Sequence, residues 1–261
     1  MKSLITIAVL LSSVFAFAKV KSEKVVYSAG ETKLEGYLYY DAALLAQKKK
    51  LPGVVVVHDW MGVGDYVKMR AEQLAGLGYM AMVADIYGQG VHPKDASEAG
   101  ALAGKYKSGD RADMRARAKA SLEILTADKR VDAAKISAMG YCFGGTVALE
   151  MARSGLPLTG AISFHGGLAA VKSEDTKNIK TKLLVLHGAI DPYVSAAEVA
   201  QFTKDLNDGN VNYEFVAYSG AVHAFTEKHV GNDIKAGAAY NEQADKRSFA
   251  AMQNFLTEVN K

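Results

Sequence analysis

The chain has 261 residues, with 31 basic and 28 acidic side chains, a formal net charge of +3, and 49% hydrophobic residues. This small, scattered charge does not indicate a nucleic-acid-binding protein, and the single cysteine excludes an internal disulfide and a cysteine-based metal cluster. No Pro/Ser-rich linker or block of charge divides the chain, so we expect one large domain.

The first residues are typical of a secretory signal peptide. Lys2 gives a positive start, residues 4–15 are almost wholly apolar, and Ala16-Phe17-Ala18 fits an A-x-A cleavage site. A membrane anchor is the alternative, but the apolar run is shorter than the roughly 20 residues that a spanning helix needs. We therefore expect residues 1–18 to be removed near Ala18. Residues 19–261 would then form a single exported domain, periplasmic or secreted, without a stable membrane anchor.

Strand-like and helix-like segments alternate along the rest of the chain. The predicted strands cover residues 25–28, 34–40, 54–57, 80–84, 135–139, 159–164, 182–187 and 212–217. The predicted helices cover residues 65–76, 95–107, 110–126, 146–153, 195–206 and 240–259. The first two strands suggest a hairpin, and the four valines at 54–57 are typical of a strand buried on both faces. This order predicts an α/β fold with a mostly parallel central sheet and helices on both faces.

The segment Gly140-Tyr141-Cys142-Phe143-Gly144 joins a predicted strand to a predicted helix and fits the G-x-nucleophile-x-G elbow. Its glycines are expected because the turn brings strand and helix together, where larger side chains would clash. The helix start favours a thiolate at Cys142. Taken alone, the motif is better explained by a small buried cysteine in a glycine-rich turn. However, an oxidising compartment penalises an idle thiol, which suggests that this one is used.

A thiol nucleophile needs a base to take its proton and a carboxylate to orient that base. In α/β-hydrolases these residues follow in the order nucleophile, acid, histidine. Cys142, Asp191 and His223 occur in that order, each soon after a predicted core strand. Asp191 could instead cap the helix that begins near Ser195, and His223 could be a half-buried loop histidine. The combination predicts a Cys-His-Asp triad.

Acyl transfer places negative charge on the carbonyl oxygen, which needs two preorganised N–H donors. In such a fold one donor follows the nucleophile and the other lies in the loop after the third strand. Phe143 and Trp60 occupy these positions, so their backbone N–H groups are predicted to form the oxyanion hole. The ring of Trp60 could equally serve to cover the core.

Five segments together resemble the dienelactone hydrolase family and cover nearly all of the chain after residue 18. They are His58-Asp59-Trp60-Met61-Gly62, Asp85-Ile86-Tyr87, Gly140-Tyr141-Cys142-Phe143-Gly144-Gly145, Gly188-Ala189-Ile190-Asp191-Pro192 and Ala221-Val222-His223-Ala224-Phe225. The resemblance implies an α/β-hydrolase fold, no cofactor and no metal. It also implies hydrolysis of a small-molecule ester or lactone through an acyl-cysteine intermediate.

The resemblance gives Asp59 a role as well. In the family, an acid at this position holds the resting thiol and is displaced by substrate; members with dienelactone activity usually carry Glu there. Lactone-cleaving members bind the substrate carboxylate with two arginines, and the corresponding places here hold Gln89 and Glu227. Because a glutamate repels an anion, we expect a neutral ester or lactone rather than dienelactone itself.

Two other classes of function stay open. A non-catalytic binding protein could keep the hydrolase scaffold, although a retired site tends to lose one of its reactive residues. A redox-responsive thiol protein would use an oxidisable Cys142, but this leaves Asp191 and His223 without a role and the chain has no resolving cysteine. We expect an enzyme, with residues 87–107 and 226–235 as walls of its pocket.

Overall fold

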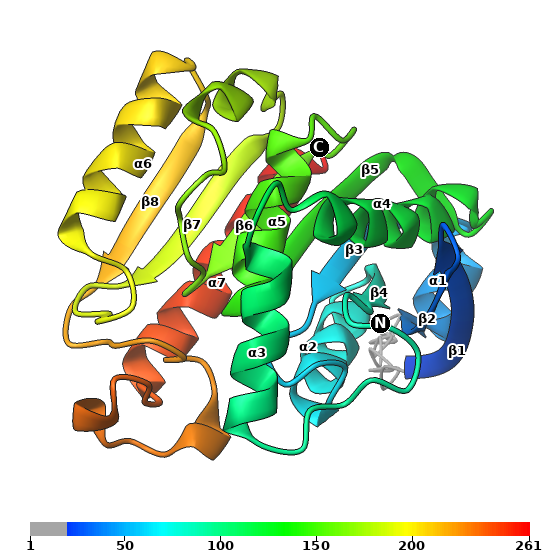
Figure 1. The fold of residues 1–261 in the computed structure, drawn as a ribbon. Coiled ribbons are helices and arrows are strands. Elements are labelled where there is room, and N and C mark those ends of the chain that lie inside the picture. Colours follow the sequence, from blue (N-terminus) through cyan, green and yellow to red (C-terminus); the bar gives the residue numbers. More distant parts are fainter. Residues whose placement is uncertain (1–19) are drawn as a thin grey trace, which may run out of the picture.

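The computed structural model describes residues 20–261, so the predicted signal peptide at residues 1–18 lies outside the described residues. Its strands are β1 (Val20–Ala29), β2 (Thr32–Asp41), β3 (Leu51–Val57), β4 (Met80–Ala84), β5 (Val131–Tyr141), β6 (Gly160–Phe164), β7 (Lys182–Gly188) and β8 (Tyr213–Tyr218). They form one sheet in the order β1-β2-β4-β3-β5-β6-β7-β8 (Figure 1). The β1–β2 and β2–β4 pairs are antiparallel and the other pairs are parallel. The predicted opening hairpin and parallel sheet are confirmed.

Helices cover both faces of this sheet (Figure 1). The α-helices are α1 (Ala42–Lys48), α2 (Asp65–Gly76), α3 (Ala96–Lys107), α4 (Ala112–Ala127), α5 (Phe143–Arg153), α6 (Ala196–Asp208) and α7 (Glu242–Val259). The short 3-10 helices are η1 (Ser173–Asn178), η2 (Lys228–Val230) and η3 (Ile234–Ala236). Apolar side chains of α2 and α7 pack on one face, and those of α4, α5 and α6 pack on the other. Within residues 20–261, no helix is both long and apolar enough to cross a membrane.

The valines of β3 show why this strand lies at the centre of the sheet. Val54 and Val56 belong to the core under α2 and α7, while Val55 and Val57 belong to the core under α4 and α5. Side chains alternate between the two faces of a strand, so an unbroken valine run supplies apolar surface to both layers. All four are fully buried, as the sequence predicts.

Several elements differ from the sequence-based expectation. Strand β1 starts at Val20, five residues earlier than predicted. Helix α1 was not predicted; it begins where Oδ1 of Asp41 accepts the backbone N–H groups of Ala43 and Leu44 at 2.8 and 3.1 Å. Strand β5 starts four residues earlier than expected, at Val131. Helix α5 starts at Phe143, directly after the predicted nucleophile, instead of at residue 146.

A buried carboxylate ties helix α5 to α4. Glu150 is fully buried and accepts hydrogen bonds from Arg111 at 2.8 Å, Arg115 at 2.8 Å and Arg153 at 2.9 Å. Arg153 is itself only 2% exposed and also donates to the carbonyl of Leu168 at 2.6 Å. This ion cluster fixes the helix that follows the elbow.

Candidate active site

The predicted elbow is a sharp turn from β5 into α5 with Cys142 at its tip. The backbone of Cys142 has φ 53° and ψ −114°, a conformation that L-residues rarely adopt. A Cβ on Gly140 would lie 2.2 Å from backbone atoms of Gly144, and a Cβ on Gly144 would lie 2.3 Å from the carbonyl oxygen of Val57. Both glycines are therefore required by the steric contact that the sequence predicts.

The structure brings the three predicted triad residues together at the carboxyl ends of β5, β7 and β8. Sγ of Cys142 lies 3.0 Å from Nε2 of His223, and Nδ1 of His223 lies 2.8 Å from Oδ2 of Asp191. Oδ1 of Asp191 accepts the backbone N–H of Tyr193 at 2.8 Å, which fixes the carboxylate. Helix α6 is capped by Ser195 instead, so Asp191 is not the cap of that helix.

The environment of His223 favours its protonated form. Burial alone would lower the pKa of this imidazole, but the sulfur of Cys142 and the carboxylate of Asp191 outweigh burial and raise the pKa to about 10. The Nδ1–H then donates to Asp191 and the Nε2–H donates to the sulfur. Such an arrangement suits a general acid and base that serves a thiol nucleophile.

Trp60 and Phe143 line the cavity into which Cys142 and His223 open. Within residues 20–261, no group accepts a hydrogen bond from the backbone N–H of Trp60 or of Phe143. The loop that carries Trp60 is held by Tyr87, whose hydroxyl donates to the Trp60 carbonyl at 2.9 Å. Trp60 is 36% exposed, so it is not part of the buried core. Both N–H groups thus belong to residues that line the cavity of Cys142, and neither has an acceptor among the described residues.

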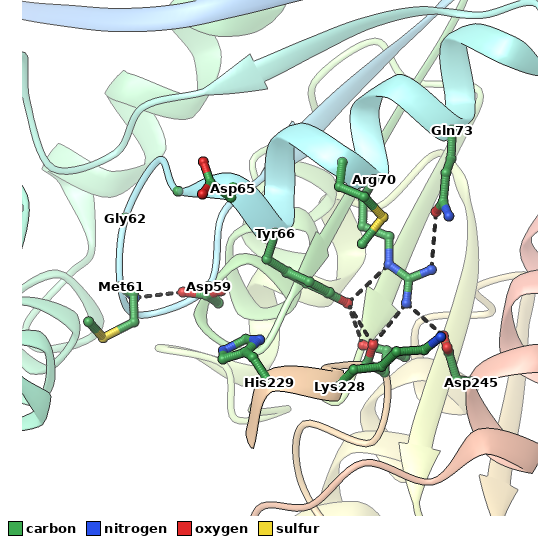
Figure 2. Close-up of a pocket in the computed structure, with 13 residues that line it drawn as sticks. Asp59, Met61, Gly62, Asp65, Tyr66, Arg70, Gln73, Lys228, His229 and Asp245 are labelled. Carbon is green, nitrogen blue, oxygen red and sulfur yellow. Dashed lines mark hydrogen bonds and ion pairs between the residues drawn. The ribbon is translucent and has the colours of Figure 1, made fainter. Parts of the chain in front are cut away.

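Asp59 does not hold the thiol in this structure. Its Oδ1 accepts the backbone N–H of Met61 at 2.6 Å (Figure 2). Within residues 20–261, the sulfur of Cys142 has a hydrogen bond with His223 and none with Asp59. The role that the resemblance implies for Asp59 is therefore not supported by the geometry. The physical reason is local, because the short side chain is used to close a turn within its own loop. Burial also raises the pKa of this carboxyl.

Two cavities lie side by side here, and the larger one does not contain the nucleophile. The cavity of Cys142 and His223 has a volume of about 330 Å³, and its other walls include Lys107, Tyr193, Glu227 and Val230. The larger cavity, of about 540 Å³, is lined by Asp59, Tyr66, Arg70 and His229 among others (Figure 2). The smaller cavity is the candidate active site because Cys142, His223, Trp60 and Phe143 all line it.

The segments 59–61 and 226–229 separate the two cavities. Trp60 and Glu227 line the cavity of Cys142, whereas Asp59 and Met61 on one segment and Thr226, Lys228 and His229 on the other line the larger cavity. Of the predicted walls, residues 226–230 of the segment 226–235 line these two cavities, and Lys107 of the segment 87–107 lines the cavity of Cys142. Gln89 does not line the site; its side chain donates to Glu35 at 3.2 Å.

His165 is a residue of the site that sequence reasoning missed. It follows β6 with φ 39°, is fully buried, and its Nδ1 accepts the backbone N–H of Cys142 at 3.1 Å. Burial keeps the pKa of His165 well below its ordinary value, so the neutral ring donates from Nε2 to Thr226 Oγ1 at 2.8 Å. The signal in the sequence was its place at the end of a predicted core strand, which Cys142 shares.

No cluster of three or more His, Cys, Asp or Glu side chains suited to a metal ion is found within residues 20–261. The arrangement that the structure does provide is a partly buried chain of groups able to move one proton. That chain runs from Cys142 through His223 to Asp191.

Comparison with known proteins gives one family. The model of the dienelactone hydrolase family matches residues 40–260. A probable 2-oxo-3-(5-oxofuran-2-ylidene)propanoate lactonase from Bradyrhizobium sp is 29% identical over 203 residues, which cover 74% of this chain and 81% of that protein.

Two solved structures are more similar still. The structure named m3DLH is 38% identical with a TM-score of 0.87, and the match covers 93% of this chain and 99% of that one. A dienelactone hydrolase-like promiscuous phosphotriesterase from metagenomic libraries is 37% identical with a TM-score of 0.86 and the same coverage.

Proposed function

The chain belongs to the dienelactone hydrolase family and is an ester or lactone hydrolase, and we propose that it works through a Cys142–His223–Asp191 triad. The observation that carries this proposal is the unbroken contact chain from Sγ to Nε2 at 3.0 Å and from Nδ1 to Oδ2 at 2.8 Å. These are the contacts that a nucleophile, its base and the orienting acid require.

The acylation step starts from the thiolate of Cys142 beside the protonated His223. The sulfur attacks the carbonyl carbon, a C–S bond forms, and the electron pair of the C=O bond moves onto oxygen. The backbone N–H groups of Phe143 and Trp60 donate to this oxyanion. When the C=O bond re-forms, the ester C–O bond breaks and the Nε2 proton of His223 passes to the leaving oxygen. Asp191 stabilises the imidazolium before this transfer.

The deacylation step repeats these roles with water. His223, now neutral, accepts a proton from a water molecule, and the water oxygen attacks the thioester carbon. Collapse of this second oxyanion breaks the C–S bond, so that the acid product leaves and the thiolate of Cys142 is restored. His223 has regained its proton, and the cycle closes without a cofactor.

The test is turnover of a short-chain p-nitrophenyl ester before and after alkylation with iodoacetamide, with Cys142 adducts weighed by mass spectrometry. We expect turnover to disappear in proportion to alkylation of Cys142, and Cys142→Ala to be folded and inactive. Full activity of Cys142→Ala would refute the mechanism. Fast alkylation without cleavage of any ester or lactone would favour the redox-sensor or binding functions.

A second candidate activity is the hydrolysis of a neutral phosphotriester at the same thiol. The observation that favours it is the 37% identity and TM-score of 0.86 with the protein described as a promiscuous phosphotriesterase. The test is release of p-nitrophenol from a diethyl p-nitrophenyl phosphate by the wild type and by Cys142→Ala. Release by the wild type alone would support it.

Export is a separate part of the proposal. The positive start at Lys2, the apolar run and the Ala16-Phe17-Ala18 site support a signal peptide. The mass of the mature protein, recovered from the periplasmic fraction or the medium, tests this. A chain that begins at Lys19 is the expected result, and an intact Met1 in the cytoplasmic fraction would contradict it.

A further inference from the structure

Glu227 is a buried acid in the wall of the cavity of Cys142, and no lysine or arginine of residues 20–261 forms an ion pair with it. It is 2% exposed, and its Oε1 has no hydrogen-bond partner among the described residues. Oε2 lies 3.6 Å from Nε2 of the exposed His229, beyond hydrogen-bond range. A buried polar atom without a partner is costly, so this free oxygen, on a residue that lines the same cavity as Cys142 and His223, calls for an explanation.

The nearby Arg70 does not act as the partner of this carboxyl. Its guanidinium donates to Tyr66 at 3.2 Å, to Gln73 at 3.2 Å, to the Thr226 carbonyl at 2.9 Å and to Asp245 at 2.6 Å (Figure 2). All of these bonds are on the side of the larger cavity. A buried carboxylate that no lysine or arginine compensates is strongly disfavoured, so burial favours the protonated form of Glu227.

We propose that Glu227 is a specificity-determining residue of this site, which as a neutral acid donates its O–H to an oxygen of an uncharged substrate. The inference rests on the proposed function, because the oxygen that it serves belongs to an ester, lactone or triester held for attack by Cys142. The geometry supports it on three counts: Glu227 lines the same cavity as the nucleophile, it is buried, and its Oε1 is unpartnered.

Several groups set the charge of Glu227. Burial, and next the nearby carboxyl of Asp59, raise the pKa of Glu227 to about 8, against the opposite effects of His223 and Arg70. The titratable and charged groups around Glu227 come from β5, α2, η2 and the loops after β3 and β8. In that order they are Tyr141, Tyr66 and Arg70, His229, Asp59, and His223. Lys107 of α3 lines the same cavity.

The experiment compares two p-nitrophenyl esters of similar size, the neutral butyrate and the anionic hemiglutarate, between pH 6 and pH 9.5. We expect kcat/KM of the wild type for the butyrate to fall about tenfold through a step near pH 8, the size of one lost hydrogen bond. The hemiglutarate should fall about a further tenfold, because the ionised carboxyl repels it.

Two substitutions of Glu227 separate charge from hydrogen bonding. Glu227→Leu should lower kcat/KM for the butyrate about tenfold below pH 8 and remove the step. Glu227→Gln keeps an N–H donor and should recover most of that loss, again without the step. Glu123→Gln, at an exposed acid of α4, is the matched control and should keep the wild-type profile. Thermal unfolding midpoints verify that every variant is folded.

An infrared difference spectrum between pH 6 and pH 9.5 gives a readout that does not depend on turnover. The C=O band of a protonated carboxyl should be lost in the wild type and should be missing from the Glu227→Gln difference spectrum. A step near pH 8 that persists in Glu227→Gln, or a Glu227→Leu variant as active as the wild type, would overturn the inference while leaving the Cys142 mechanism intact. If the wild type cleaves no ester or lactone at all, both proposals fall.

Discussion

The Glu150→Gln substitution tests the buried ion cluster on α5, the helix that follows Cys142. It keeps the shape of the side chain but removes the charge that three arginines share. Arg115 retains Asp175 at 2.6 Å and Arg111 has partial access to solvent, so the main penalty falls on Arg153, which is 2% exposed. Breaking a buried pair by removing one partner costs roughly 3–5 kcal/mol. Because only one arginine is fully stranded, we expect about 3 kcal/mol.

The measurement is urea and thermal unfolding followed by circular dichroism. In a domain of this size, about 3 kcal/mol corresponds to a fall in Tm of roughly 6–12 °C. The control is Glu123→Gln, which breaks an exposed pair with Lys119 and should change stability by less than about 0.5 kcal/mol. Adding Arg153→Met to Glu150→Gln should recover part of the loss, because the stranded charge is removed. A Glu150→Gln variant as stable as the wild type would refute this reasoning.

Three further outcomes are expected. Asp191→Asn should lower kcat about 10⁴-fold, because the amide no longer holds the imidazole in its working tautomer; stopped assays at high enzyme concentration measure this, and a loss below tenfold would count against the triad. Gly144→Ala should give little folded protein, because its Cβ would lie 2.3 Å from the Val57 carbonyl oxygen; expression yield and unfolding midpoints decide. For Glu227→Gln, stability relative to the wild type should rise with pH between 4.5 and about 8, because the unfolded chain ionises this glutamate while the folded wild type keeps its proton. The gain is at most about 1.4 kcal/mol per pH unit, and urea unfolding at pH 5 and pH 8 measures it; a pH-independent difference would contradict the buried proton.

The core of the fold could be predicted because it depends on short, strongly patterned segments. The valines of β3 and the buried run of β4 have the composition of central strands wherever they lie in a sheet. The elbow could be predicted because any side chain at position 140 or 144 would clash with the backbone, so glycine is required there. Helix α1 could also have been predicted, since Asp41 before Ala42 and Ala43 is an N-cap signal.

For the site, the sequence could predict which residue types lie at the ends of the core strands, but not the directions of their side chains. Cys142, Asp191 and His223 follow core strands, so the topology of a parallel sheet brings them to one edge. The side-chain directions of Asp59 and Glu227 could not be obtained in this way. Whether a carboxyl turns toward the sulfur or toward a backbone N–H depends on the path of its loop, which periodicity does not describe.

The positive φ of Cys142 also bears on the alternative that this cysteine only fills space in a turn. A small side chain placed only to fill a turn would be glycine here, because φ 53° and ψ −114° cost an L-residue about 1–3 kcal/mol and glycine much less. Stability alone would therefore choose against cysteine at this position. Cys142 thus has a side chain at a backbone position where glycine would be more stable. A chemical role explains the cysteine at this position, whereas packing does not.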